Sequence, residues 1–145
     1  MTDVDRMLRE LGEQLPGDLE LPPRCFTQMG GKIVSYEPNT SFVTEWPLET
    51  WYGNPAMVLQ GGIAMAMIDN TFGPFSFLEA KGPTTSLDMQ ISYLRPVPID
   101  SGNVTVRVNK QSQTKSYIHF NGELVRADGK VASIATTRMA ILKAR

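Results

Sequence analysis

The feature that most constrains this fold is the apolar stretch from Trp51 to Leu78, in which Asp69 is the one formally charged residue. The residues before and after Asp69 are mostly Ala, Ile, Met and Phe, and no polar face recurs at a helical period. A helix that is apolar all round is a buried helix. The stretch therefore predicts one long central helix that begins near Gly61 and is enclosed by the rest of the chain.

Asp69 is unusual in such a helix, because desolvating a carboxylate costs several kcal/mol unless a partner compensates it. One interpretation is a functional carboxylate, since perturbed buried acids cluster at active sites. The other is a structural aspartate that is paired with a backbone donor or a distant arginine.

The tripeptide Gln60-Gly61-Gly62 lies at the expected start of this helix. The first N–H groups of a helix have no internal partner, and the macrodipole makes that end attractive to negative charge. Such donors suit a developing oxyanion, and together with Asp69 they indicate acyl chemistry. Alternatively, the two glycines only permit a sharp entry into the helix or close packing.

Composition excludes several classes of protein. With 145 residues, 41% hydrophobic and 20% charged, the chain is predicted to be one soluble domain spanning residues 1–145. A net charge of −1 argues against nucleic acid, and a single Cys and a single His argue against disulfides or a zinc site. No signal peptide and no membrane span are recognisable, so we expect a cytoplasmic protein.

A catalytic pair of Cys25 and His119 is not favoured, because nothing near Cys25 indicates an activated thiolate. We expect His119 to be structural or on the surface.

The N-terminal third predicts a helix, a connector and a hairpin. Apolar residues at i, i+3, i+4 and i+7 predict an amphipathic helix over residues 2–15, which Pro16-Gly17 ends. Residues 16–30 are rich in Pro and Gly and read as a connector. Two β-rich segments, 32–36 and 41–46, flank a turn and predict a hairpin.

After the central helix the pattern is β. Pro74 is expected to kink or end the helix, and residues 75–80 are expected to give another turn or so before residues 81–83. Four antiparallel strands are then predicted, and Asp128-Gly129 joins the last two. The first of the four is expected to be half-buried. The strands span residues 84–94, 103–110, 116–125 and 130–142. The fold class is α+β, with an antiparallel sheet that curls around the helix and buries it on all but one side.

The segment GNPAMVLQGGIAMAMIDNTFG followed by TTSLDMQISYLRPV resembles the hotdog-fold acyl-CoA thioesterases of the phenylacetate-pathway (PaaI-like) type. The resemblance covers residues 46–142. It is carried by Asn54, Gly61, Gly62, Asp69, Ser86 and Tyr93-Leu94-Arg95-Pro96. The sequence departs from the family at Gln60, where the family usually has His. Glutamine forms hydrogen bonds but does not titrate near neutral pH.

The resemblance implies a hotdog core over residues 31–145, preceded by an extra helix and connector over residues 1–30. It implies that the Gly61 N–H binds the thioester oxygen and that Asp69 acts as general base or nucleophile. Asn54 and Gln60 would position the water or the thioester, and Ser86 would hold water or the carboxylate.

The implied site lies between two protomers, so a homodimer, paired again into a homotetramer, is expected. The substrate is an acyl-CoA, and no separate cofactor and no metal are implied.

Substrate contacts follow from chemistry and remain open at this stage. Arg95 and Lys115 are candidates for the CoA phosphates, or else solvated surface charges. The acyl group is expected to meet the apolar side of the site, although these residues could equally be plain core. The candidates there are Gly62, Met57, Met65, Phe72 and Phe75.

Two other functions are compatible with the same fold. A non-catalytic protein that binds or senses acyl-CoA is the main alternative, and Gln60 gives it weight. A hydratase or dehydratase is less favoured, because such hotdog enzymes use a His with their acid and this helix has none.

Overall fold

The computed structural model describes residues 2–143 and contains three α-helices, a short 3₁₀ helix and six strands. In chain order these elements are α1 (Asp3–Gln14), α2 (Arg24–Gln28), β1 (Lys32–Glu37), β2 (Ser41–Trp46), η1 (Thr50–Tyr52), α3 (Gly61–Ala80), β3 (Thr84–Tyr93), β4 (Val104–Gln113), β5 (Tyr117–Val125) and β6 (Val131–Ile141).

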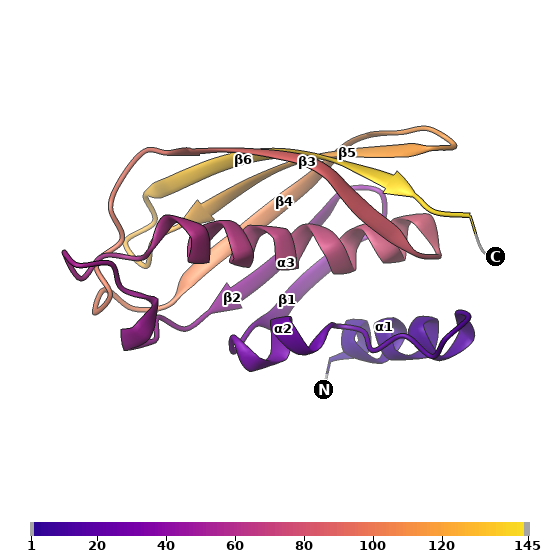
Figure 1. The fold of residues 1–145 in the computed structure, drawn as a ribbon, viewed down its shortest axis with the longest axis horizontal. Coiled ribbons are helices and arrows are strands. Elements are labelled where there is room, and N and C mark those ends of the chain that lie inside the picture. Colours follow the sequence, from indigo (N-terminus) through magenta and orange to yellow (C-terminus); the bar gives the residue numbers. More distant parts are fainter. Residues whose placement is uncertain (1, 144–145) are drawn as a thin grey trace.

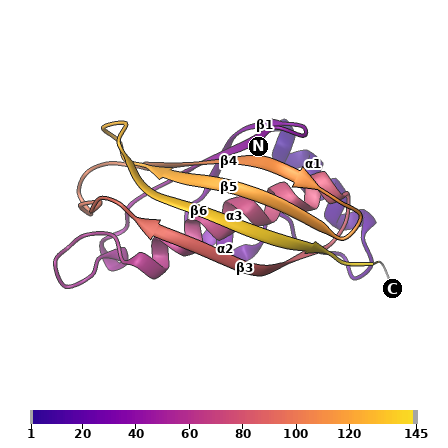
Figure 2. The same ribbon diagram turned by 90° about the horizontal axis from the view of Figure 1, so that it is seen from above.

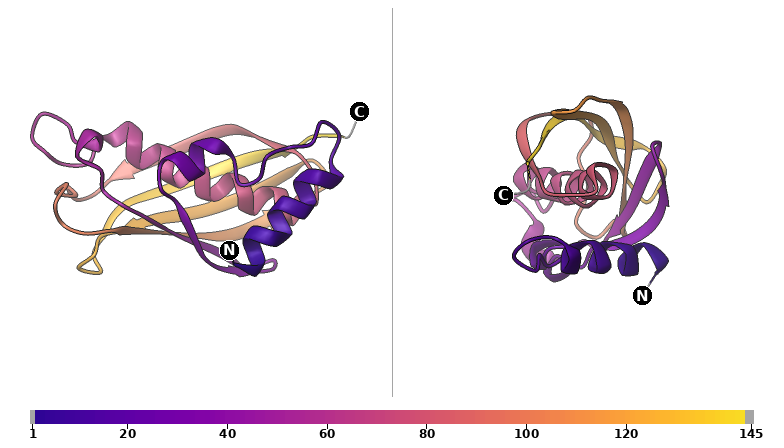
Figure 3. Two further views of the ribbon diagram at one scale, coloured as in Figure 1. Left: turned by 90° about the horizontal axis from the view of Figure 1, so that it is seen from below. Right: turned by 90° about the vertical axis from the view of Figure 1, so that its right-hand side faces the viewer.

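All six strands form one antiparallel sheet in the order β1-β2-β4-β5-β6-β3. The sheet curves around α3, which runs along its inner face (Figures 1 and 2). The helices α1 and α2 lie below α3, on the side away from the sheet (Figures 1 and 3). This arrangement is the hotdog fold, so the predicted α+β architecture with an additional N-terminal helix is confirmed.

The core forms between the inner face of the sheet and one side of α3. Phe72 stacks on Phe120 with ring centroids 5.8 Å apart, and Phe75 stacks on Phe42 at 5.6 Å. All four rings are buried. Aromatic pairs of this kind add to the free energy gained from burying their area, and they fix the height of α3 above the sheet.

Pro74 lies inside α3, which continues to Ala80. Of the two outcomes expected at Pro74, an end of the helix is ruled out, and the further turn expected before residues 81–83 is present. The buried Ser76 hydroxyl donates to the Gly73 carbonyl at 2.7 Å, so a side chain bonds to the backbone next to the proline. Pro74 supplies no N–H to the helix, and its side chain is buried.

The N-terminal third follows its prediction except at one helix. Thr2 and Asp5 form a capping box at the start of α1, and Leu8 is fully buried beneath it. Residues 16–30 are not only a connector, because they contain the five-residue helix α2. Phe26 from α2 packs edge-on against Trp46, with ring centroids 4.9 Å apart.

β3 is an edge strand and is more exposed than expected. Most of its side chains face solvent, and only Met89 and Ile91 in its second half are partly buried. A register shift between Ser86 and Asp88 marks a bulge at Leu87, which is 46% exposed. Within residues 2–143, β3 pairs only with β6 and most of its side chains are exposed, so the expectation of a half-buried strand is wrong within a single chain.

The predicted hairpin of β1 and β2 and the predicted hairpin of β5 and β6 are both present. The single domain was predicted over residues 1–145, and its outermost residues 1 and 144–145 lie outside the described residues. Between residues 2 and 143, no helix is long and apolar enough to cross a membrane.

Candidate functional site

The start of α3 presents two backbone donors. The Gln60 carbonyl accepts the N–H groups of Ile63 and Ala64, which begins the helix as predicted. The Gln60 side chain makes no capping bond. Among residues 2–143, neither Gly61 nor Gly62 donates its N–H to an acceptor. Both donors are therefore available to an anionic or carbonyl ligand, and the helix dipole reinforces them.

Asp69 lies on the side of α3 that the sheet leaves uncovered, and it is exposed. The expected burial of its carboxylate is therefore wrong within a single chain. The fully buried residues of α3 include Met67, Ile68 and Phe72, whereas Asp69 lies at the edge of the sheet beside β3. The Ser86 hydroxyl donates to Asp69 Oδ1 at 3.1 Å. The structure thus brings these two predicted residues together, as a hydroxyl–carboxylate pair between α3 and β3.

The open side of α3 also carries glycines that nothing within the chain requires. A Cβ atom built on Gly62 or on Gly73 would meet no atom within 4 Å. Neither residue adopts a positive φ. Since a glycine in a helix costs up to about 1 kcal/mol relative to alanine, the bare backbone here is unexplained by the chain alone.

Asp69 and Gly61 are separated by eight residues of helix, which is about 12 Å along the axis at the standard rise per residue. An oxyanion donor must lie within about 3 Å of the reacting oxygen, and a base must be within hydrogen-bond reach of the proton that it takes. One chain's Asp69 and the same chain's Gly61 therefore cannot act on one thioester.

Hydrogen bonds within the loop before α3, and one to the segment after β3, fix the conformation of this loop. Asn54 Oδ1 accepts the N–H groups of Ala56 at 2.9 Å and of Val58 at 3.2 Å. The Leu59 N–H donates to the Val97 carbonyl at 2.8 Å. Within the described chain, Asn54 therefore uses its side-chain oxygen to shape the loop, which leaves its amide nitrogen as the group to offer to a ligand.

A cavity of about 290 Å³ lies beside the helix start. Arg95 and Gly61 both line it, so the structure brings these two predicted residues to one place. The Arg95 guanidinium donates to the Val131 carbonyl at 2.7 Å, which holds it at the rim. The remaining walls are mostly apolar and include Val58, Ala64, Leu94 and Val97.

Tyr93 also lines this cavity, and no role was predicted for it although it belongs to the recognised motif. Its hydroxyl donates to the Gly61 carbonyl at 2.6 Å. A tyrosine hydroxyl is protonated at neutral pH, and partial burial raises the pKa of the Tyr93 hydroxyl further. The signal that could have found it is the position of an aromatic hydroxyl at the end of the strand beside the helix start.

Other predicted substrate contacts are not at this place. Phe72 and Phe75 are fully buried in the core of the single chain, the alternative that the sequence left open for them, and their contact with an acyl group stays a prediction. Met65 is partly exposed, and Met57 lies in the loop with 49% of its surface exposed.

Lys115 is in the turn between β4 and β5, at the opposite end of the sheet from Gly61. The strand register shows this, because Tyr117 and Thr85 both pair with Ala140, whereas Tyr93 pairs with Ser133. Within one chain, Lys115 therefore does not join Arg95 at the cavity.

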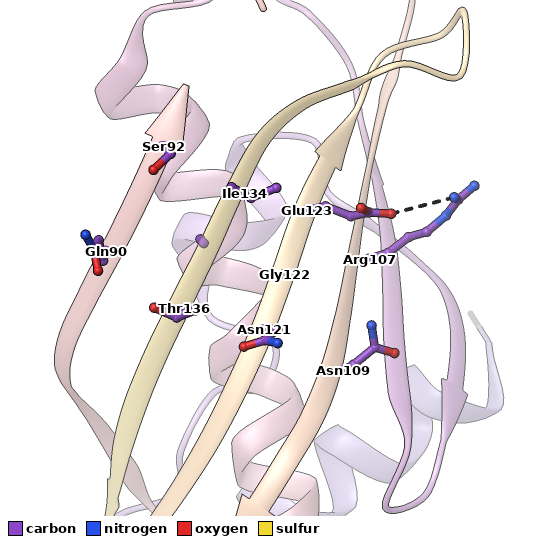
Figure 4. A pocket seen from close by; sticks show the side chains of 10 residues that line it. Gln90, Ser92, Arg107, Asn109, Asn121, Gly122, Glu123, Ile134 and Thr136 are labelled. Carbon is purple, nitrogen blue, oxygen red and sulfur yellow. Dashed lines mark ion pairs between the residues drawn. The ribbon is translucent and has the colours of Figure 1, made fainter. Parts of the chain in front are cut away.

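A groove of about 510 Å³ lies on the outer face of the sheet (Figure 4). Polar side chains of β3, β4, β5 and β6 line it, including Gln90, Asn109, Asn121 and Thr136. Arg107 and Glu123 form an ion pair across it at 4.0 Å. The sheet separates this groove from α3, and no predicted site residue reaches it.

Cys25 and His119 do not form a pair. Cys25 accepts a hydrogen bond from the Asn70 amide at 3.3 Å, whereas His119 is exposed on β5 opposite Ser112 and Arg138. Among residues 2–143, no three His, Cys, Asp or Glu side chains are placed to hold a metal ion.

A family model described as the thioesterase superfamily matches residues 58–133, which include the whole of α3 and β3. No curated protein matches the sequence significantly.

Solved structures share the fold. A thioesterase from Haemophilus influenzae has a TM-score of 0.80 at 17% identity, with 99% of this chain and 93% of that chain covered. A phenylacetic acid degradation-related protein from Ralstonia eutropha has a TM-score of 0.77 at 24% identity, with 97% and 100% covered. A point mutant of the phenylacetic acid degradation protein PaaI from Thermus thermophilus has a TM-score of 0.73 at 21% identity, with 81% and 97% covered. These likenesses agree with the hotdog fold.

Proposed function

The chain belongs to the thioesterase superfamily, a family of thioester hydrolases, and from this premise we propose that it hydrolyses an acyl-CoA to the free acid and CoA. The observation that carries the proposal is the Asp69–Ser86 pair on the open side of α3. A carboxylate there can meet a substrate and a partner chain.

In the proposed reaction the Gly61 N–H binds the thioester carbonyl oxygen and stabilises the negative charge that develops on it. Asp69 either takes a proton from the attacking water or attacks the carbonyl carbon itself. Ser86 orients the Asp69 carboxylate through its hydroxyl. Gln60 and the Asn54 amide position the water or the thioester.

We propose that the active unit is a homodimer, with Asp69 of one protomer facing Gly61 of the other. Three observations support this: the separation of about 12 Å between the two groups within one chain, the unpaired edge of β3, and the bare glycines on the open side of α3. An exposed strand edge is a template for pairing with another chain. The proposal extends to two such dimers forming a homotetramer.

The cavity at Arg95 and Gly61 suggests where the substrate lies. Arg95 would pair with a CoA phosphate at the rim, and Met57 and Met65 would contact the acyl group. Lys115 could take part only from another protomer, because it is remote from Gly61 in its own chain.

The test is the Asp69→Asn variant, assayed for release of free thiol from acetyl-, hexanoyl-, benzoyl- and phenylacetyl-CoA. We expect kcat to fall by about 10²-fold or more, the usual contribution of general acid–base catalysis. Asp88→Asn is the matched control, because Asp88 is an exposed carboxylate on β3 that pairs with Arg138. A variant at Asp69 that keeps kcat within about tenfold of the parent would contradict the proposal.

A second candidate is a protein that binds acyl-CoA without hydrolysing it. The observation in its favour is Gln60, which supplies no titratable group beside the two free N–H donors. Calorimetry that shows tight binding of an acyl-CoA, with no thiol released by the parent from any of the four substrates, would favour this alternative.

A further inference from the structure

We infer that Tyr93 is a positioning residue for the oxyanion donors, acting through the peptide unit that joins Gly61 to Gly62. The inference rests on the proposed function and adds to it a residue with no assigned role. It also adds Gly62 as a second donor whose strength depends on a side chain of β3.

The geometry begins with the peptide unit. Tyr93 Oη donates to the Gly61 carbonyl oxygen at 2.6 Å. This carbonyl and the Gly62 N–H belong to the same planar peptide unit, one at each end of its dipole. A hydrogen bond at the carbonyl polarises the unit and strengthens the N–H as a donor. The carbonyl has two lone pairs, so it can accept from Tyr93 and from the helix together.

Contact between the ring and the glycine fixes the position of the hydroxyl. A Cβ atom added to Gly61 would lie 3.0 Å from both Cζ and Oη of Tyr93. The close approach therefore needs a residue without a side chain at position 61. Gly62 differs, because its added Cβ would meet nothing within 4 Å. The two neighbouring glycines thus serve different purposes: Gly61 admits Tyr93, and Gly62 leaves the open side bare.

The placement of Tyr93 also links the helix start to the edge strand. Tyr93 is the last residue of β3, and its backbone pairs with Ser133 of β6. The Tyr93 side chain therefore connects the edge of β3 directly to the peptide unit of Gly61 and Gly62. The ring is 52% exposed, so the hydroxyl is anchored by the Gly61 carbonyl rather than by deep burial.

The test compares Tyr93→Phe with the parent by amide NMR and by steady-state kinetics on the four acyl-CoA substrates. Phenylalanine keeps the ring and removes the hydroxyl. We expect the Gly62 amide proton and nitrogen signals to move upfield. We also expect kcat to fall by about 3- to 10-fold with KM unchanged, as for the loss of one neutral hydrogen bond felt only in the transition state.

Tyr117→Phe is the matched control, because Tyr117 is an exposed tyrosine at the other end of the sheet. It should change neither the Gly62 signals nor kcat. Gly61→Ala should break the same hydrogen bond in another way, because its methyl group pushes the Tyr93 hydroxyl away from the carbonyl oxygen. The effects of Gly61→Ala and Tyr93→Phe on the Gly62 signals should therefore not add.

The outcomes separate this inference from the proposed function. Unchanged Gly62 signals in Tyr93→Phe would overturn the positioning role, even if the parent is an active thioesterase. Shifted signals with an unchanged kcat would also overturn it. If the parent hydrolyses none of the substrates, the proposed function is overturned. The role of Tyr93 in positioning oxyanion donors is then overturned with it, whatever the NMR result.

Discussion

Ser86 is the side chain whose contribution is easiest to isolate, because its hydroxyl contacts the proposed catalytic carboxylate directly. In Ser86→Ala that carboxylate loses a donor, and hydrogen bonds to charged groups contribute about 1.5–3 kcal/mol. We expect kcat for the best of the four acyl-CoA substrates to fall by about 10-fold or more. Ser92→Ala, which removes an exposed hydroxyl from the same strand, is the control and should retain parental kcat.

An equal loss in both serine variants would show that β3, rather than the contact with Asp69, is responsible. Unchanged turnover in Ser86→Ala would show that the carboxylate needs no help from this hydroxyl.

Residue identities were easier to predict from the sequence than residue environments. Asp69 and Ser86 were both recognised, and the structure brings them together. The expected burial of Asp69 was wrong, because the apolar character of a segment does not say which of its sides the sheet covers. Phe72 and Phe75 were named as acyl contacts or as plain core, and within the chain their rings fill the core.

At the scale of elements, one buried ion pair fastens the end of α3. Glu79 is 3% exposed and accepts hydrogen bonds from Lys110 Nζ at 3.0 Å and from the Tyr36 hydroxyl at 2.8 Å. The backbone N–H of Asn39 donates to the same carboxylate at 3.1 Å. One carboxylate thus joins α3 to β4 and to the hairpin of β1 and β2.

Removal of one partner should be costly, because it leaves an uncompensated buried charge. We expect Lys110→Met to lower the free energy of unfolding by about 3–5 kcal/mol in urea titrations. Arg107→Met, which breaks an exposed ion pair, should lower it by about 1 kcal/mol or less. A loss in Lys110→Met no larger than that in Arg107→Met would contradict a structural role for the Glu79 network.

Elements with strong local signals were predictable from the sequence. The long central helix and the two hairpins follow from hydrophobic pattern and turn residues. α2 was missed because five residues are too few to show a helical period. Pro74 was expected to kink or end α3, and the helix continues past it to Ala80 with the proline buried.

At the scale of the whole molecule, the open side of α3 predicts how closely a second chain approaches. Gly73→Leu adds a side chain at a position where a Cβ atom meets nothing within 4 Å in its own chain. We expect this variant to keep its circular dichroism spectrum but to run as a monomer by light scattering and to lose thiol release. The control Glu13→Leu places the same side chain on an exposed position of α1 and should leave assembly unchanged.

If Gly73→Leu assembles and turns over like the parent, the open side of α3 does not face a close neighbour. The proposed dimer would then need another interface.

Contacts between distant segments were the least predictable part. Tyr93 and Gly61 are 32 positions apart, and the residues next to either one in the sequence do not predict their hydrogen bond. The exposure of Asp69 and of β3 would be explained by the second chain that we propose. A single sequence encodes that covering surface without a periodic pattern to reveal it.

The separation of Asp69 and Gly61 along α3 has a genetic consequence. Two variants that are each inactive, Asp69→Asn and Gly61→Val, should restore one another when co-expressed. A mixed dimer contains one intact centre, formed by Asp69 of the Gly61→Val chain and the Gly61 N–H of the Asp69→Asn chain. Its other centre lacks both groups. Random pairing should then recover about a quarter of the parental rate. Such rescue between two inactive alleles cannot occur if each centre is made by one polypeptide.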